Sequence, residues 1–333
     1  MNLVTGSTGL VGSHLLIDLL KKGEPVRAMK RETSDTSIVE KLFKFYSCES
    51  LFSKIEWVNA DVIDVPSIEE VMEGVNRVFH CAAVVSFHPA DEEKMFKINV
   101  EGTANVVNAA MGSGVQKLIY TSSVAALGRT KAGEHINENS IWKSGSLNTK
   151  YAVTKNAAEN EVWRGIEEGL NAAIVNPGVV IGPGDSSRSS GALLGKVESG
   201  LKFYPLGTNG FVDARDVSGA MVKLAESEVS EKRFVLVSEN LKFKTLLDTM
   251  AGELGKKQPS IAAKPWMLNL ATRVMWVLEK LTGKKALVTA DSVRSSPHDF
   301  YYDNSRAKSE LEMDFIPVGE AVENAVAFLR GNH

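Results

Sequence analysis

Two side chains suited to proton transfer stand four residues apart in the segment Tyr151-Ala152-Val153-Thr154-Lys155. Residues four apart on a helix share a face, so the phenol and the ammonium group point the same way. A nearby cation favours the phenolate, which makes the tyrosine a proton donor and acceptor nearer neutral pH. The pattern is common by chance, and its value depends on what lies around it.

Two serines precede this pair at the end of an apolar run. Ser122 and Ser123 close a predicted strand over 117–123. Ligands of open parallel sheets bind at the carboxyl ends of the strands. One of the two serines is therefore predicted to face the same site as Tyr151. Which of them does so depends on where the strand ends.

The start of the chain has the pattern of a phosphate-binding turn. Leu3 and Val4 read as a short buried strand, and a helix is predicted to follow over 13–22. Between them, glycines permit a tight turn, close approach of a pyrophosphate, and close packing of the helix on the strand. The spacing is Gly-x-x-Gly-x-x-Gly rather than the common Gly-x-Gly-x-x-Gly. The predicted dinucleotide contacts in this turn are Gly6, Thr8, Gly9, Leu10, Val11 and Gly12.

The end of the predicted second strand, 25–29, bears on the choice of cofactor. NAD-binding proteins usually place an acid here to accept from the ribose 2′-hydroxyl. This chain has Lys30 and Arg31 instead, with Glu32 next to them. A guanidinium matches the geometry of a phosphate. The sequence favours NADP(H), with NAD(H) left open.

The first half of the chain alternates strand and helix. Strands are predicted at 3–4, 25–29, 55–58, 77–83, 117–123 and 172–176, and helices at 13–22, 34–52, 66–74, 92–111 and 151–168. This alternation predicts an α/β fold with a Rossmann-type doubly wound parallel sheet. Residues 1–181 would form the dinucleotide-binding domain, to which 210–237 returns with a late strand at 234–237. Residues 182–209 and 238–333 would form a smaller C-terminal substrate-binding lobe.

Composition narrows the class of protein. The chain has 38 Lys and Arg against 41 Asp and Glu, interspersed, so neither nucleic acid nor an acidic membrane is indicated as a partner. Cys48 and Cys81 are the two cysteines, which predicts neither a disulfide framework nor a metal site. No apolar run has the length of an integral membrane segment, and no signal peptide is recognisable. We expect a cytoplasmic protein that binds a small-molecule substrate.

The helix predicted over 265–281 is unusually rich in Trp and Met, with Trp266, Met267, Leu270, Met275, Trp276 and Leu278. A core helix of the small lobe is the favoured interpretation. The alternatives are a wall of a lipophilic pocket or a contact with a membrane surface. Among the histidines, His14 and His80 are predicted to be packed in the core, and His88 to lie near the substrate mouth.

These segments together resemble the extended short-chain dehydrogenase/reductases, and the resemblance covers nearly the whole chain. It implies that Tyr151 exchanges the substrate proton and that Lys155 holds the nicotinamide ribose and tunes the tyrosine. It also implies that a serine orients the substrate oxygen: Ser123 is favoured, and Ser122 stays open. Asn99, in Ile98-Asn99-Val100-Glu101-Gly102-Thr103, matches a helix asparagine that supports a proton relay to the lysine.

The resemblance implies further contacts. Those to the cofactor come from Asp61, Val62, Ala82, Ala83, Ser122, Tyr151, Lys155, Pro177, Gly178 and Val180, and Phe211 to Val217 resembles the family's return to the sheet. The loop Ser86-Phe87-His88-Pro89 is predicted to lie at the substrate mouth. Ser86, Phe87, Ser123 and Tyr151 are therefore the predicted substrate contacts.

Within the family the chain is most similar to the dihydroflavonol 4-reductase and 3β-hydroxysteroid dehydrogenase branch. This similarity depends on the segments 26–31, Asn176-Pro177-Gly178 and, more weakly, the tail 297–308. Sugar dehydratases have an Asp-Glu pair where Val124-Ala125 stand, and sugar epimerases a tyrosine where Leu127 stands.

The resemblance implies hydride transfer between nicotinamide and a ketone or secondary alcohol of a bulky, largely apolar substrate. A cofactor-retaining nucleotide-sugar epimerase and a nucleotide-sensing binding protein are the alternatives. A homodimer paired through the helices near 92–111 and 151–168 is implied by analogy.

Overall fold

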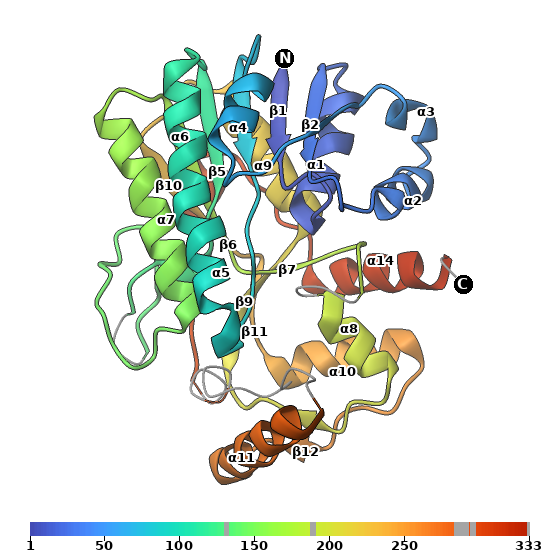
Figure 1. Ribbon diagram of the computed structural model, residues 1–333. Coiled ribbons are helices and arrows are strands. Elements are labelled where there is room, and N and C mark those ends of the chain that lie inside the picture. Colours follow the sequence, from blue (N-terminus) through green and yellow to red (C-terminus); the bar gives the residue numbers. More distant parts are fainter. Residues whose placement is uncertain (130–132, 187–190, 283–292, 294–297, 332–333) are drawn as a thin grey trace.

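A seven-stranded parallel sheet forms the centre of the protein in a computed structural model, which describes residues 1–129, 133–186, 191–282, 293 and 298–331 (Figure 1). Its strands lie in the order β10-β6-β5-β4-β1-β2-β3. Their bounds are β1 Asn2–Thr5, β2 Val26–Lys30, β3 Glu56–Asn59, β4 Arg77–His80, β5 Lys117–Thr121, β6 Ala172–Pro177 and β10 Lys232–Leu236. The Rossmann-type prediction is confirmed, and each predicted strand of this sheet is present.

The strand order reverses between β1 and β4, which are adjacent although far apart in sequence. The connections after these two strands run to opposite faces of the sheet, so a crevice opens at their carboxyl ends. The glycine turn follows β1, and the segment Cys81-Ala82-Ala83 follows β4. The sheet therefore brings two predicted cofactor segments together, the glycine turn and Ala82-Ala83.

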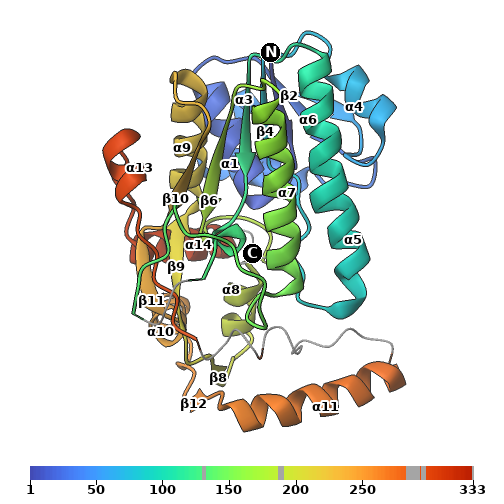
Figure 2. The ribbon, with the colours of Figure 1, turned by 90° about the vertical axis from the view of Figure 1, so that its left-hand side faces the viewer.

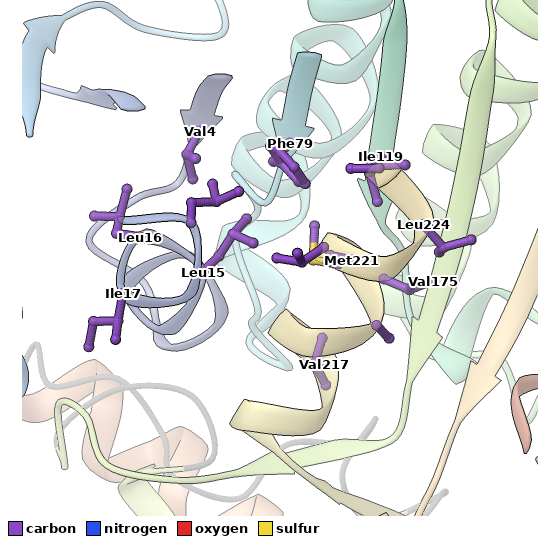
Figure 3. Packing of buried hydrophobic residues seen from close by; sticks show 14 of the residues in the cluster. Val4, Leu15, Leu16, Ile17, Phe79, Ile119, Val175, Val217, Met221 and Leu224 are labelled. Atoms are coloured by element: carbon purple, nitrogen blue, oxygen red, sulfur yellow. The ribbon is translucent and has the colours of Figure 1, made fainter. Parts of the chain in front are cut away.

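Helices cover both faces of the sheet because both faces are apolar. One face carries α1 (Leu10–Lys21) and α9 (Ala214–Glu226), where Leu15 and Met221 pack against Val4 and Phe79 of the strands (Figure 3). The other face carries α4 (Val65–Val71), α6 (Gly102–Gly112) and α7 (Lys150–Glu167). This packing holds the start of α1 and the start of α7 at the same edge of the sheet.

Two predicted helices differ from expectation. The helix over 34–52 is divided into α2 (Ser37–Phe45) and α3 (Glu49–Phe52), because Ser47 adopts a positive φ of 52°. The helix near 92–111 consists of α5 (Glu92–Phe96), a π-helical turn over Lys97–Glu101, and α6. Wide turns of this kind are frequent at functional sites, and this one contains Asn99.

The small lobe has its own sheet and core. β7 (Val179–Ile181) and β11 (Glu239–Lys242) flank β9 (Thr208–Asp213). Helices α8 (Gly191–Glu198), α10 (Phe243–Leu254) and α14 (Val318–Gly331) pack on this sheet around a buried cluster that includes Leu247. A two-stranded sheet of β8 (Phe203–Tyr204) and β12 (Ile261–Ala262) lies further out.

The division between domain and lobe is less simple than the predicted ranges. β7 falls within the predicted first domain but pairs with β9 of the small sheet. In the opposite sense, α13 (Ser305–Glu310) falls within the predicted lobe, yet its Ala307 packs in the core cluster of the large sheet. Burial of apolar faces, rather than order along the chain, decides where these segments belong. Pro297, the first residue of the tail segment, lies outside the described residues.

The helix α11 (Pro265–Thr282) has nearly the predicted bounds, but the prediction of a lobe-core helix is wrong. None of its described side chains is fully buried, and Trp266, Leu270 and Val274 are exposed. Figure 2 shows α11 at the far end of the lobe, away from the large sheet. The side chains of Trp276 and Leu278 lie outside the described part.

Candidate active site

The glycine turn after β1 is built as its spacing predicts. Gly6 has φ of +62°, and a Cβ there would lie 2.6 Å from the backbone nitrogen of Ala82. A Cβ on Gly12 would lie 2.3 Å from the Gly6 carbonyl oxygen, so the helix can approach the turn only at a glycine. Val11 packs against the core cluster. Gly6 and Gly12 thus shape the turn from within.

The N-terminus of α1 has the features of an anion site. Gly9 is the N-cap residue, and no side chain caps the helix or places an acid in its first turn. The first N–H groups of a helix have no partner within it and carry partial positive charge. Thr8, Gly9 and Leu10 line a groove at this point. A pyrophosphate would satisfy these N–H groups.

The same groove continues past the ends of β2, β3 and β4. Its described lining includes the predicted residues Lys30, Arg31, Asp61, Val62, Ala82 and Ala83. Lys30 donates through Nζ to Asn59 Oδ1 at 2.8 Å, whereas Glu32 is exposed and is not part of the described lining. These residues, with the uncapped α1, fit a dinucleotide. Sequence reasoning did not single out Ser34, Gly184 or Asp185 as cofactor contacts, although these residues also line the groove.

Several predicted cofactor residues lie outside that groove lining: Val11, Gly12, Ser122, Tyr151, Lys155, Pro177, Gly178 and Val180. Pro177 ends β6, and Val180 lies in β7. Gly178 joins them, where a Cβ would lie 2.4 Å from the Gly210 carbonyl oxygen. The glycine therefore lets the chain pass from the large sheet to the small one.

The structure separates the two serines. The Ser122 hydroxyl donates to Glu159 Oε2 at 2.6 Å and is turned into the interior. The Ser123 side chain lies next to the Tyr151 phenol, where it acts to lower the phenol's pKa, and its hydroxyl oxygen accepts from the Ala125 N–H at 3.1 Å. β5 ends at Thr121, so the chain leaves its regular alternation at this point. Ser123, the favoured serine, is the one beside Tyr151.

Lys155 has partners that the sequence did not indicate. Its Nζ donates to the Tyr120 hydroxyl at 2.6 Å and to the Thr121 carbonyl oxygen at 2.9 Å. Burial lowers the pKa of Lys155 to about 7, although the charge of Glu159 acts against this. Burial raises the pKa of Tyr151 to about 12, although the neighbouring Ser123 side chain acts against this rise. The expected lowering of the tyrosine pKa is thus absent, because desolvation outweighs any effect of the lysine.

A buried carboxylate lies one turn beyond Lys155. Glu159 is 1% exposed. Its Oε2 accepts from Ser122 Oγ and from Asn176 Nδ2 at 2.7 Å, and its Oε1 accepts from Arg233 Nη1 at 2.8 Å. Sequence reasoning missed this residue. The available signal was its spacing of four from Lys155, which places both on one face of α7.

Asn99 holds the loop that follows β4. Its Oδ1 accepts from the Val84 N–H at 2.7 Å, and its Nδ2 donates to the Val84 carbonyl oxygen at 3.0 Å. The same Nδ2 donates to Thr154 Oγ1 on α7 at 3.1 Å. Asn99 therefore ties the π-helical turn to both the groove and the helix of Tyr151.

A chain of buried hydrogen bonds connects the groove with Asn99. The N–H of Ala82 donates to Thr5 Oγ1, which lies 2.7 Å from His80 Nδ1. His80 Nε2 lies 3.0 Å from Thr103 Oγ1, which donates to the Asn99 carbonyl oxygen at 2.5 Å. Burial lowers the pKa of His80 to about 3, so the ring is neutral at pH 7. Thr5 then donates to Nδ1, and the ring proton sits on Nε2.

The loop at the predicted substrate mouth lies beside Tyr151. The Phe87 ring is 6.3 Å from the Tyr151 ring, centroid to centroid, and Phe87 is 44% exposed. Ser86 Oγ donates to Asp91 Oδ2 at 2.8 Å, which fixes the loop. His88 accepts from the Ala90 N–H as a cap of the next turn.

His14, which with His80 is predicted to lie in the core, is buried, and burial lowers its pKa to about 4.

Comparison with known proteins identifies this arrangement. The model of the NAD dependent epimerase/dehydratase family matches residues 2–236, which include the large sheet and the Tyr151 site. The chain belongs to this family. Within the described residues no helix is long and apolar enough to cross a bilayer.

Individual relatives agree with the family. A Synechocystis sp. protein named for dihydroflavonol 4-reductase is 30% identical over 339 residues, which cover 99% of this chain and 94% of that protein. Sterol demethylase protein B of Methylococcus capsulatus is 28% identical and covers 98% of each chain. The crystal structure of gox2253 is 32% identical, covers 100% of this chain and 98% of that one, and superposes with a TM-score of 0.83.

Proposed function

We propose that this protein is an NADP(H)-dependent oxidoreductase that interconverts a ketone and a secondary alcohol on a bulky, largely apolar substrate. The observation that carries the proposal is the placement of Ser123 next to the Tyr151 phenol, four residues before Lys155 on α7, at the edge of the sheet where the dinucleotide groove also opens. The names of full-length relatives support a carbonyl substrate and an apolar body.

In the direction of reduction, the groove residues would hold a nicotinamide dinucleotide, which would supply the hydride for the carbonyl carbon. Ser123 holds the carbonyl oxygen through its hydroxyl. Tyr151 gives its phenolic proton to that oxygen as the C=O electron pair moves onto it, which yields the secondary alcohol. A pKa of about 12 keeps Tyr151 protonated at neutral pH, as a proton donor must be. Lys155 would hold the nicotinamide ribose and return a proton to the phenolate.

The other residues hold reactants in place. Gly9 and the first turn of α1 bind the pyrophosphate, and Asp61 and Val62 contact the adenine side. Asn99 supports the proton relay to Lys155 through its place between the β4 loop and α7. Phe87, half exposed against Tyr151, contacts the apolar substrate, with Ser86 on the same loop.

The preference for NADP(H) rests on the end of β2. Lys30 and Arg31 line the groove where NAD-binding proteins have an acid, and Glu32 is turned to solvent. A 2′-phosphate would gain charge-assisted hydrogen bonds here. An NAD(H)-dependent enzyme would gain nothing from these two cations.

Fluorescence titration of the purified protein with NADPH and NADH tests the proposal first. We expect tighter binding of NADPH, and an Arg31→Ala variant should weaken it about tenfold or more. Lys54→Ala, which removes an exposed cation outside the groove lining, should change nothing. Equal binding of both nucleotides contradicts the assignment of NADP(H). A nucleotide that cannot be exchanged, together with interconversion of UDP-sugars, favours the epimerase instead.

A multiple-turnover assay with apolar ketones and NADPH then tests the reaction. We expect reduction of the ketone with release of NADP⁺. A cytoplasmic location and a homodimer paired through α5, α6 and α7 complete the proposal. Cell fractionation and sedimentation velocity test them independently of the chemistry.

A further inference from the structure

The far end of the lobe exposes apolar side chains in a regular pattern. On α11, Trp266 is 64% exposed, Leu270 56% and Val274 50%. They are spaced by four residues and so form one stripe along the helix. Large apolar side chains normally avoid such exposure when they are contiguous. The stripe needs a partner of some kind.

The strands next to α11 extend the apolar surface. Phe203 of β8 and Ile261 of β12 are register partners in a parallel pair, so their side chains share a face, and they are 45% and 40% exposed. Figure 2 shows these strands and the start of α11 together at the end of the lobe. With Leu206, six of the thirteen large exposed hydrophobic residues of the described chain belong to this end.

The charge of this end is opposite to that of the protein. Between Lys256 and Thr282 there are five basic side chains and one acidic one, in a chain of formal net charge −3. On an ideal helix, Arg273 points within about 20° of Trp266, so a cation adjoins the stripe. The basic residues are Lys256, Lys257, Lys264, Arg273 and Lys280, all exposed.

We propose that α11 and the β8–β12 strands form a surface that docks on an anionic lipid bilayer. Apolar side chains with Trp on one side and basic residues beside them characterise helices that lie in the membrane interface. The helix is not apolar enough to span a bilayer, so it would lie on the surface. A second copy is a poorer occupant, because a two-fold contact would bring Arg273 and Lys264 against like charges.

Flotation of the full-length protein with vesicles tests this proposal. We expect binding to phosphatidylcholine vesicles that contain about a third phosphatidylglycerol, and at least tenfold weaker binding to phosphatidylcholine alone. A Trp266→Ser/Leu270→Ser variant should lose binding to both. A Lys264→Glu/Arg273→Glu variant should bind anionic vesicles at least about 25-fold more weakly, because each cation near such a surface contributes on the order of fivefold.

Ile141→Ser serves as the matched control, since Ile141 is 76% exposed but lies outside this surface. It should bind vesicles as the unaltered protein does. Circular dichroism should show that all variants remain folded. Absence of vesicle binding overturns the proposal, as does equal binding to both vesicle types. A dimer in sedimentation velocity that Trp266→Ser/Leu270→Ser converts to monomer, without vesicle binding, assigns the surface to a second copy. None of these results depends on the proposed enzymatic reaction.

Discussion

The active-site edge of the large sheet buries charged side chains, whereas the far end of the lobe exposes apolar ones. At the sheet edge, Lys155 and Glu159 are each 1% exposed, and their charged groups hydrogen-bond with other residues of the protein. At the lobe end, Trp266 and Leu270 are more than half exposed. Desolvation sets proton affinities at the first place, whereas exposed apolar area at the second is available for association. The proposed reaction and the proposed membrane contact therefore lie in separate regions of the molecule.

The largest expected effect concerns the phenol at the sheet edge. Tyr151→Phe removes the proton donor and should lower kcat for ketone reduction about 10²- to 10⁴-fold. Affinity for NADPH should stay near that of the unaltered protein, because the groove lining does not include Tyr151. Steady-state kinetics and nucleotide titration measure the two quantities. Near-normal turnover in this variant contradicts the proposed mechanism.

The buried ion pair at this edge should contribute more to stability than a half-exposed pair on the same helix. Glu159→Gln leaves the Arg233 guanidinium uncompensated and should lower the free energy of unfolding by about 3 kcal/mol or more. Glu161→Gln breaks a half-exposed pair with Arg164 on the same helix and should cost less than about 1 kcal/mol. Denaturant unfolding of the two variants compares them. Equal costs would remove the contrast between buried and exposed charge.

Within the lobe, two leucines test how far its outer end differs from its core. Leu247 is 1% exposed in α10, and Leu247→Ala should cost about 2 to 5 kcal/mol of unfolding free energy. Leu270→Ala on α11 should change it by no more than about 0.5 kcal/mol. Thermal and denaturant unfolding measure both. A large cost at Leu270 would mean that the α11 stripe is covered within the protein.

The smallest effect is a shift in pH dependence. The Tyr120 hydroxyl accepts from Lys155 and so stabilises the charged form, and Tyr120→Phe should lower the pKa of Lys155 further below about 7. If the charged lysine is the active form, the alkaline limb of the kcat/KM profile moves to lower pH by about one unit. Tyr46→Phe is the control: it removes a hydroxyl that accepts from Asn324 rather than from Lys155, and it should leave the profile unchanged. An unmoved profile for Tyr120→Phe would assign this contact a structural role alone.

Local spacing let the sequence predict much of the fold and the core of the site. The alternation of strand and helix implied the parallel sheet, and the three glycines implied the turn, because both depend on residues close together in the chain. The four-residue spacing of Tyr151 and Lys155 placed them on one helix face for the same reason. The basic residues at the end of β2 could likewise be identified from the sequence alone.

Contacts between distant segments were decided only by the tertiary structure. The choice between Ser122 and Ser123 depended on where β5 ends and on Glu159 lying behind it. The pairing of Glu159 with Arg233 joins α7 to β10, and Lys155 finds Tyr120 on β5. Periodicity identifies an apolar helix such as α11, but it contains no information on whether another element covers that face. Burial is a property of the assembled layers, and so is every pKa that burial sets.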